Sequence, residues 1–281
     1  MAKEIDRLGI NVLRIAEMTP DGEPEIMELK PASICLNSYS VSKAYTAAAA
    51  GFLYDRGLLR MDERVTDILG AYLPGYYDSR WDKMTVDMTL RHHCGFKPGY
   101  LDIDCADLNP VTDGDYLRYL FDTTLECEPG TRYCYSDAAF YLISRVVSEK
   151  TGLPLDNFLW KELFLPLGFR EAAWSHCPHG YAMGATGLYI NSGDMAKLAA
   201  LYMNGGVWRG RRLLSENWVR MSLEREYGFN PHKNGAFGKG GMLGQMMLAI
   251  PAQNRAVAWH SMDAHPNEKG NLVEWVLNYN A

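Results

Sequence analysis

The sequence predicts an α+β fold in which strands from both ends of the chain form one antiparallel sheet flanked by helices. Residues 11–29 contain two strand-like segments around the turn sequence Thr19–Gly22, and residues 245–260 contain two more around Pro251–Asn254. Each set predicts a hairpin. The expected strands are 11–17, 25–29, 245–250 and 255–260.

Between the hairpins, apolar residues recur mostly at helical spacing, and capping residues mark several helix ends. Ser192 and Ser215 are expected N-caps, and Gly57 stands where a glycine ends a helix. The expected helices are 41–56, 85–92, 113–122, 137–150, 156–164, 193–204, 216–222 and a C-terminal one through Leu272, Trp275, Val276 and Tyr279.

We therefore expect residues 1–281 to form a single catalytic unit of two intermingled lobes. A mostly helical lobe at about 58–185 is inserted between sheet-forming segments at about 1–57 and 186–281. The lobes are expected to meet in a cleft, which is the usual place for a substrate.

The composition is that of a folded protein, with 281 residues, 47% hydrophobic content and 22% charged content. The net charge of −6 and the lack of a basic run argue against a nucleic-acid partner. The most apolar stretch, 44–54, is too short to span a bilayer. A small-molecule substrate is the better expectation, and the sequence leaves the oligomeric state open.

The first ten residues lack the apolar core of a secretory signal, and the six cysteines form no C-x-x-C pair. Reduced thiols and a cytoplasmic location are expected. The clusters His92-His93-Cys94 and His176-Cys177-Pro178-His179 lack the spacing of a metal site, so neither a metal nor a cofactor is expected.

Ser40 and Lys43 place a hydroxyl and an amine one helical turn apart, at the expected start of helix 41–56. Positions i and i+3 share a helix face, so the Lys43 amine can reach the Ser40 oxygen, whereas Ser42 points elsewhere. This is an activated-serine arrangement, although short motifs of this kind also occur by chance.

Tyr135 follows a Pro129-Gly130 turn and precedes a helix capped by Ser136 or Asp137. A phenol can shuttle a proton when cationic neighbours lower its pKa, and Lys43 could be one such neighbour. The alternative for an isolated tyrosine is a packing role.

Lys239, Gly240 and Gly241 lie at the glycine-rich entry to the C-terminal hairpin. Glycines there let a substrate approach the backbone closely, and Lys239 supplies a positive charge. The alternative is a flexible hairpin loop with a solvated lysine.

In their order along the chain, S-x-x-K, Y-x-[N/D] and K-x-G resemble the serine β-lactamase and penicillin-binding-protein superfamily, and more narrowly its class C β-lactamase-related branch of esterases and D-aminopeptidases. The sequence around the motifs also resembles that branch, over about residues 30–262. Further similar segments are Asp55–Asp62, Leu90–Gly95, Pro129–Tyr133 and Gly187–Tyr189.

The resemblance implies an acyl-enzyme mechanism in which Ser40 attacks a carbonyl while Lys43 and Tyr135 handle its proton. It places the oxyanion hole on the backbone N–H groups of Ser40 and Met242. Substrate binding falls to Asp137, Lys239, Gly240 and Gly241, with Lys239 binding a substrate carboxylate or supporting the acidity of Tyr135.

Asp137 departs from the family pattern, which often has asparagine there. An ionised Asp137 beside Lys43 would keep that lysine protonated and shift the base role toward Tyr135. The chain is also short for this branch, which indicates a more open cleft.

The first hypothesis is a serine hydrolase that acts on a small ester or amide through an acylated Ser40. A β-lactamase or D,D-peptidase, with a β-lactam or peptide substrate, is the alternative within the same chemistry. An inactive relative with a binding or regulatory role is the alternative of another class. The natural substrate and its stereochemistry stay open.

Overall fold

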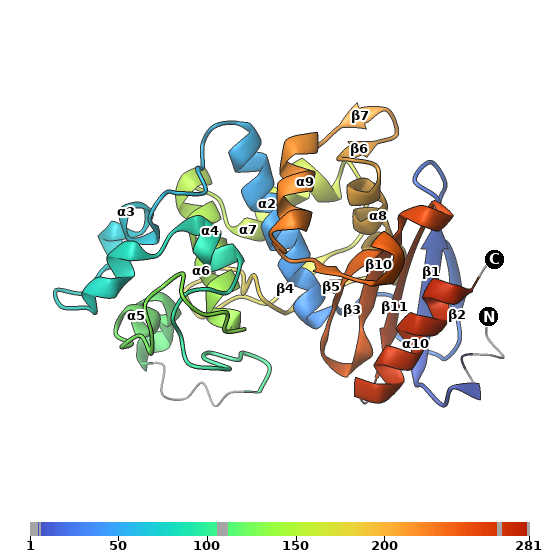
Figure 1. Ribbon diagram of the computed structural model, residues 1–281, viewed down its shortest axis with the longest axis horizontal. Helices are drawn as coiled ribbons and strands as arrows, with labels where there is room; N and C mark the ends of the chain where they lie inside the picture. The colour runs from blue at the N-terminus through green and yellow to red at the C-terminus, as the bar shows by residue number, and fades with distance from the viewer. Residues whose placement is uncertain (1–4, 6, 106–111, 263–265, 280–281) are drawn as a thin grey trace.

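The computed structural model describes residues 5, 7–105, 112–262 and 266–279. Its main feature is a six-stranded antiparallel sheet in the order β2-β1-β11-β10-β9-β8 (Figure 1). The predicted α+β fold and both predicted hairpins are confirmed. The strands are β1 (Val12–Met18), β2 (Glu25–Glu28), β8 (Asn230–Pro231), β9 (Phe237–Gly240), β10 (Met246–Ile250) and β11 (Arg255–Ser261).

The two hairpins join through β1 and β11, which pair antiparallel near the middle of the sheet. Ile15 lies opposite Trp259, and Glu17 lies opposite Val257. This pairing brings the two ends of the chain into one sheet.

Helices cover both faces of the sheet. α8 (Ser192–Met203) packs on one face against β1, β10 and β11. α10 (Pro266–Asn278) lies against the other, where its Leu272 and Val276 join a buried cluster with Leu248, Val257 and Trp259. Every residue of β10 and β11 is buried, because both faces are covered.

The N-cap of α8 differs from the prediction. Asn191, not Ser192, caps the helix, because the Asn191 Oδ1 accepts a hydrogen bond of 2.9 Å from the Asp194 N–H. The Ser192 hydroxyl instead lies 2.8 Å from Nδ1 of His260 on β11. Because Ser192 contacts the sheet, its hydroxyl does not cap the helix as its position in the sequence suggests.

The other elements between the hairpins are mostly helices and single turns. One prediction needs correction: segment 156–164 is α-helical only to Leu159 and continues as a π-helical turn. The elements are β3 (Leu36–Asn37), η1 (Tyr39–Val41), α2 (Ser42–Asp55), α3 (Val65–Ile68), η2 (Gly70–Tyr72), η3 (Ser79–Lys83), α4 (Val86–Leu90), η4 (Thr112–Gly114), α5 (Tyr116–Phe121), α6 (Asp137–Thr151), α7 (Leu155–Leu159), η5 (Trp160–Phe164), β4 (Ala173–Trp174), β5 (Leu188–Ile190), β6 (Val207–Trp208), β7 (Arg211–Arg212), α9 (Glu216–Glu224), η6 (Lys233–Gly235), η7 (Met242–Gly244) and η8 (Pro251–Gln253).

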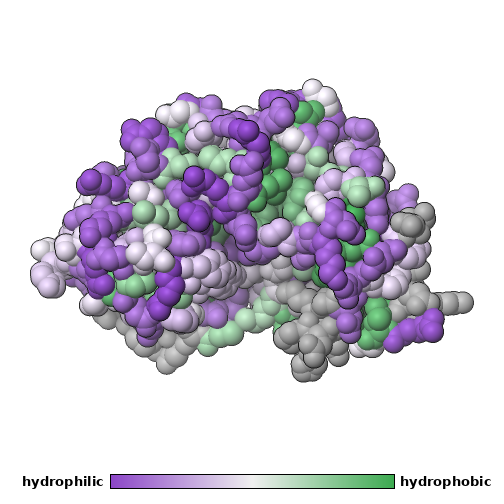
Figure 2. Space-filling model, viewed as in Figure 1, coloured by the Kyte–Doolittle hydropathy of each residue, from purple (hydrophilic) through white to green (hydrophobic). Residues whose placement is uncertain are grey.

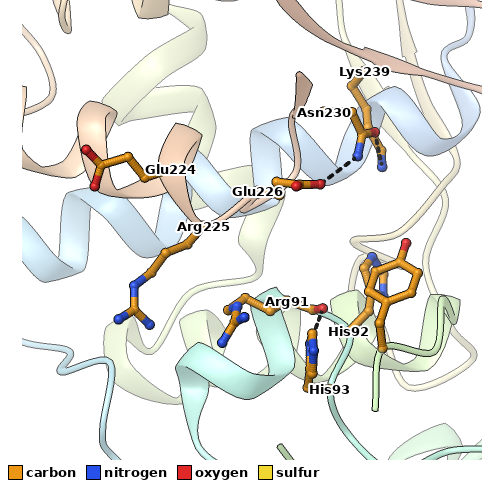
Figure 3. Close-up of a pocket in the computed structure, with 9 residues that line it drawn as sticks. Arg91, His92, His93, Glu224, Arg225, Glu226, Asn230 and Lys239 are labelled. Atoms are coloured by element: carbon orange, nitrogen blue, oxygen red, sulfur yellow. Dashed lines mark hydrogen bonds between the residues drawn. The ribbon is translucent and has the colours of Figure 1, made fainter. Parts of the chain in front are cut away.

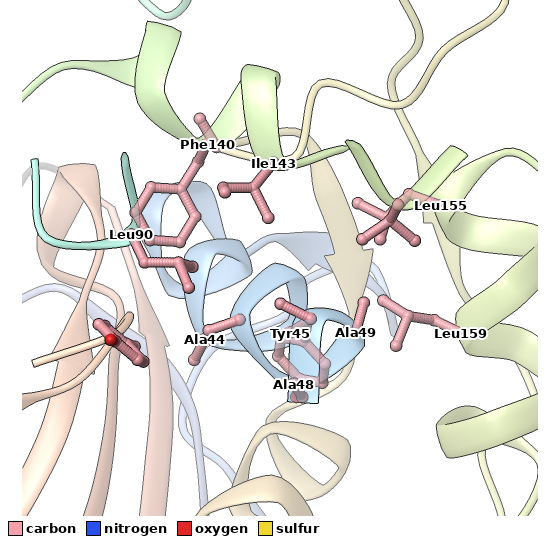
Figure 4. Close-up of a cluster of buried hydrophobic side chains, with 14 of the residues drawn as sticks. Ala44, Tyr45, Ala48, Ala49, Leu90, Phe140, Ile143, Leu155 and Leu159 are labelled. Atoms are coloured by element: carbon pink, nitrogen blue, oxygen red, sulfur yellow. The ribbon is translucent and has the colours of Figure 1, made fainter. Parts of the chain in front are cut away.

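α2 is the central helix of the molecule, and all its residues from Ser42 to Leu53 are buried. Its alanines let neighbouring helices approach closely, so that Ala44 and Ala49 lie near Phe140 of α6 and Leu159 of α7 (Figure 4). The helix ends where predicted, because Gly57 takes the left-handed conformation with φ +68°. The division into lobes at residues 58 and 185 stays a prediction.

Hydrophilic residues cover most of the face seen in Figure 2, and hydrophobic ones show mainly near its middle. Trp208, Trp218 and Trp259 are buried in the core. All six cysteines are free thiols, as expected. Within the described ranges, no helix has the length and apolar character needed to cross a membrane.

Candidate active site

Ser40 lies in the single 3₁₀ turn η1, directly before the first residue of α2. Two hydrogen bonds hold this turn: the Tyr39 N–H donates to Asn37 Oδ1 at 2.9 Å, and the Ser42 hydroxyl donates to the Tyr39 carbonyl at 2.6 Å. Ser40 therefore stands at a helix N-terminus, as predicted, where developing negative charge is favoured.

Lys43 is fully buried and donates three hydrogen bonds, one with each ammonium hydrogen. Its Nζ lies 3.0 Å from Ser40 Oγ, 2.6 Å from Asp137 Oδ1 and 2.9 Å from the Ala185 carbonyl oxygen. The predicted contact between Ser40 and Lys43 is thus present, and Asp137 completes a buried ion pair.

Opposing effects act on the pKa of Lys43. Burial lowers it, whereas the Tyr135 phenol group and the Asp137 carboxylate raise it, and the net result lies above the usual lysine range. Lys43 is therefore a cation at neutral pH. With its three hydrogens in use, it has no lone pair available to accept the serine proton.

Tyr135 stands in the loop before α6, and its hydroxyl donates a 2.7 Å hydrogen bond to Ser40 Oγ. The Lys43 Nζ lies 4.8 Å from the centroid of its ring, and the Lys239 Nζ lies 5.3 Å from it. Two cations therefore flank the phenol ring. Ser136 caps the helix that follows.

Asp137 is the first residue of α6, and its second carboxylate oxygen accepts a 3.2 Å bond from the Ile103 N–H. Asp102 and Asp104 lie next to it, with carboxylate oxygens of the three within 4.8 Å of one another. Burial, together with the Asp137 charge, raises the pKa of both neighbours. The sequence analysis missed this acidic cluster, because loop 99–105 carries no periodic pattern.

The end of β9, with Lys239 and Gly240, and the following Gly241 lie against η1, the turn that holds Ser40. A Cβ on Gly241 would lie 2.5 Å from the Ser38 carbonyl oxygen, so only glycine allows this approach. The Lys239 Nζ lies 3.3 Å from Asn230 Oδ1 on β8. Met242 begins the turn that follows and is partly exposed.

His92 is a site residue to which the sequence analysis gave no role. Its ring centroid lies 4.6 Å from that of Tyr135, and its Nδ1 accepts a 3.4 Å bond from the Ser136 N–H. Burial, followed by the Lys239 and Lys43 charges, holds its pKa well below the usual histidine range. A neutral His92 thus supports the Tyr135 ring. Its sequence signals were the family-like segment 90–95 and the cluster His92-His93-Cys94.

A cavity of about 380 Å³ begins beside Lys239 (Figure 3). Lys239 and Asn230 lie on one side of it, and Arg91 and His93 lie on the other. Both acidic and basic side chains line the cavity, which suits a polar part of a substrate. Its walls are Arg91, His92, His93, Tyr133, Glu224, Arg225, Glu226, Asn230 and Lys239.

The two histidine clusters of the sequence make other contacts. His176 Nε2 lies 3.1 Å from Asp156 Oδ2, and His179 Nε2 lies 3.1 Å from the Asp113 carbonyl oxygen. His93 Nδ1 lies 2.7 Å from the Arg91 carbonyl oxygen. These rings are thus engaged by single protein oxygens.

Comparison with known structures shows the same fold. A family VIII carboxylesterase superposes with a TM-score of 0.77 at 17% identity, covering 97% of this chain and 94% of the esterase. A penicillin-binding-protein homologue from Caulobacter crescentus superposes with a TM-score of 0.76 at 15% identity, covering 95% and 94%.

Sequence comparison gives the family. An N-acetylmuramyl-L-alanine amidase from Bacillus subtilis (strain 168) is 24% identical over an alignment of length 305, which covers 79% of this chain and 67% of the amidase. The family model described as Beta-lactamase matches residues 36–277, which include Ser40, Tyr135 and Lys239. The chain therefore belongs to the β-lactamase family.

Proposed function

We propose that this protein is a serine hydrolase that forms an acyl-enzyme on Ser40 and acts on a small ester or amide. One observation carries the proposal. Ser40 Oγ accepts hydrogen bonds from both the Tyr135 hydroxyl, at 2.7 Å, and the Lys43 ammonium, at 3.0 Å. A serine held by a titratable phenol and a cation is arranged for nucleophilic attack.

Tyr135 is the proposed base. Because Lys43 is cationic, it cannot accept the proton of Ser40, whereas the Tyr135 oxygen lies 2.7 Å from Ser40 Oγ and acts in the proposed step as a phenolate. The phenolate takes the proton as Ser40 Oγ bonds to the substrate carbonyl carbon. The phenol then protonates the leaving alcohol or amine as the ester or amide bond breaks.

The negative charge on the carbonyl oxygen would be held by the backbone N–H groups of Ser40 and Met242. The close packing of Gly241 on Ser38 supports this assignment, because it brings the end of β9 beside the nucleophile turn. Each such donor contributes about 3 kcal/mol to transition-state stabilisation. Water would then attack the acyl-enzyme, with Tyr135 accepting its proton.

The polar cavity beside Lys239 supports a substrate with charged or hydrogen-bonding groups. In keeping with this, Lys239 would bind a substrate carboxylate, while Gly240 and Gly241 would let the substrate lie against β9. The esterase and amidase among the similar proteins support ester and amide substrates. The free cysteines support a cytoplasmic location.

β-Lactamase or D,D-peptidase-type activity is the second candidate, and the similarity to a penicillin-binding-protein homologue favours it. It uses the same acylation of Ser40. The two candidates differ in the substrate accepted and in the rate at which the acyl group leaves.

Intact-mass spectrometry tests both candidates. The protein is exposed to activated esters, D-amino-acid amides and β-lactams, with Ser40→Ala as the control. We expect a mass increase equal to the acyl group in the wild type and none in the variant. If the folded wild type gave neither an adduct nor turnover with any of the three classes, a binding or regulatory role would replace the hydrolase.

A further inference from the structure

Arg145 on α6 is a buried cation without an anionic partner. The residue is only 3% exposed, and no ion pair between described residues includes it. Its Nε has no hydrogen-bond partner in the described part of the chain. Its guanidinium carbon lies 3.5 Å from the ring centroid of Tyr181 and 4.8 Å from that of Tyr72.

Two aromatic rings compensate a buried guanidinium only in part. Cation–π contacts and a hydrogen bond with Tyr141 replace some of the lost hydration, but the Nε–H donor stays unfilled. A planar guanidinium matches a carboxylate, which can accept two parallel hydrogen bonds. Arg145 is therefore suited to an anion that the chain itself does not supply.

A cavity of about 430 Å³ adjoins Arg145, which is large enough for a small organic molecule. Tyr72 and Tyr181 give it aromatic walls, and Leu153 and Pro154 give it apolar ones. The ligand can thus bury an apolar or planar body while its charged end meets Arg145.

The other charged groups of this cavity narrow the choice of anion. Glu149 lines the same cavity and accepts a 3.0 Å hydrogen bond from the Tyr72 hydroxyl. Its negative charge disfavours a dianion such as phosphate more than a single carboxylate. His179 also lines the cavity, and Tyr141 lies one turn before Arg145 on α6.

We propose that this cavity is a second binding site, in which Arg145 holds the carboxylate of a small, planar organic acid between Tyr72 and Tyr181. It is separate from the catalytic residues: Arg145 follows Asp137 by eight residues on α6, about 12 Å along the helix axis.

Calorimetric titration of the whole protein tests the site, with benzoate as the probe. Benzamide has the same shape without the charge, and inorganic phosphate is the competing anion. We expect benzoate to bind at least about tenfold more tightly than either, because only benzoate offers one carboxylate on an apolar body. Tighter binding of phosphate, or equal binding of benzamide, would overturn the proposal.

Two variants locate the binding. Arg145→Met should weaken benzoate binding by about tenfold or more, and Glu149→Gln should strengthen it severalfold, because a like charge is removed. Ester turnover at Ser40 should stay unchanged in both, and it also reports whether each is folded. The Glu149→Gln result keeps the test valid if Arg145→Met does not fold. Benzoate affinity unchanged in both variants, or no binding up to about 10 mM, would rule out the site.

Discussion

The Lys43 ammonium lies 2.6 Å from the Asp137 carboxylate, and both side chains are buried. Burial lowers the pKa of Lys43, and the Tyr135 phenol group and then the Asp137 carboxylate raise it, so the pair contributes to the charge next to Ser40. A family position that often carries asparagine thus has a direct electrostatic role in this chain.

Replacing Asp137 with asparagine should lower the pKa of Lys43, because burial then acts without the opposing carboxylate. The alkaline limb of the pH profile of kcat/KM, where Lys43 loses its proton, should move to lower pH. Ester hydrolysis measured across pH checks this, with the exposed Asp62→Asn as the control. A profile unchanged in Asp137→Asn would count against the role of the pair.

Tyr135→Phe removes the hydroxyl that lies 2.7 Å from Ser40 Oγ but keeps the ring. We expect kcat/KM for an activated ester to fall by about 10² to 10⁴, the usual contribution of a positioned acid–base group. Tyr76→Phe, at a tyrosine that is 90% exposed, is the matched control and should retain full activity. Equal activities would exclude Tyr135 as the base.

Gly241→Ala should lower kcat by about 10² to 10³, the effect of losing one oxyanion donor. The new Cβ would lie 2.5 Å from the Ser38 carbonyl oxygen and would push the end of β9 from the nucleophile turn. Gly75→Ala adds the same methyl group where no atom lies within 4 Å. Steady-state kinetics of both variants check the prediction, and a normal kcat in Gly241→Ala would contradict it.

Gly51→Ala should destabilise the protein by about 1–3 kcal/mol, although alanine normally stabilises a helix interior relative to glycine. The Cβ would lie 2.3 Å from Nε1 of the buried Trp218, which already donates to the Tyr202 hydroxyl. Urea unfolding of the variant and the wild type measures the difference. A gain in stability would show that the Trp218 side chain relaxes at little cost.

His260 should make the protein less stable as the pH falls. Burial, and then the Arg14 charge, lower its pKa to about 4, so the unfolded chain binds this proton near pH 6.5 and the folded chain does not. Stability is therefore full above about pH 6.5 and is lost toward pH 4, by about 2 kcal/mol at pH 5. Urea unfolding at pH 6.5 and at pH 5 should show a smaller loss of stability for His260→Gln than for the wild type. An equal loss of stability would assign the effect to other groups.

Several features follow from neighbouring residues alone, and these were predicted. The hairpins depend on alternating strand residues around short turns, and the end of α2 depends on the left-handed conformation of Gly57. The contact of Lys43 with Ser40 follows from helical geometry. The prediction of Ser192 as the N-cap of α8 was wrong, because a distant residue contacts its hydroxyl. Ser192 lies against His260, and Asn191 caps the helix.

Periodicity and capping are properties of neighbouring residues, and they were enough to predict the α+β elements and the serine with its nearby lysine. The order of three motifs along the chain indicated the family. The charge state around that serine depends instead on contacts between distant segments. Lys43 meets Asp137 across 94 residues, and His92 reaches the Tyr135 ring from another loop. Burial and long-range pairing set these pKa values, and neither can be read from local spacing.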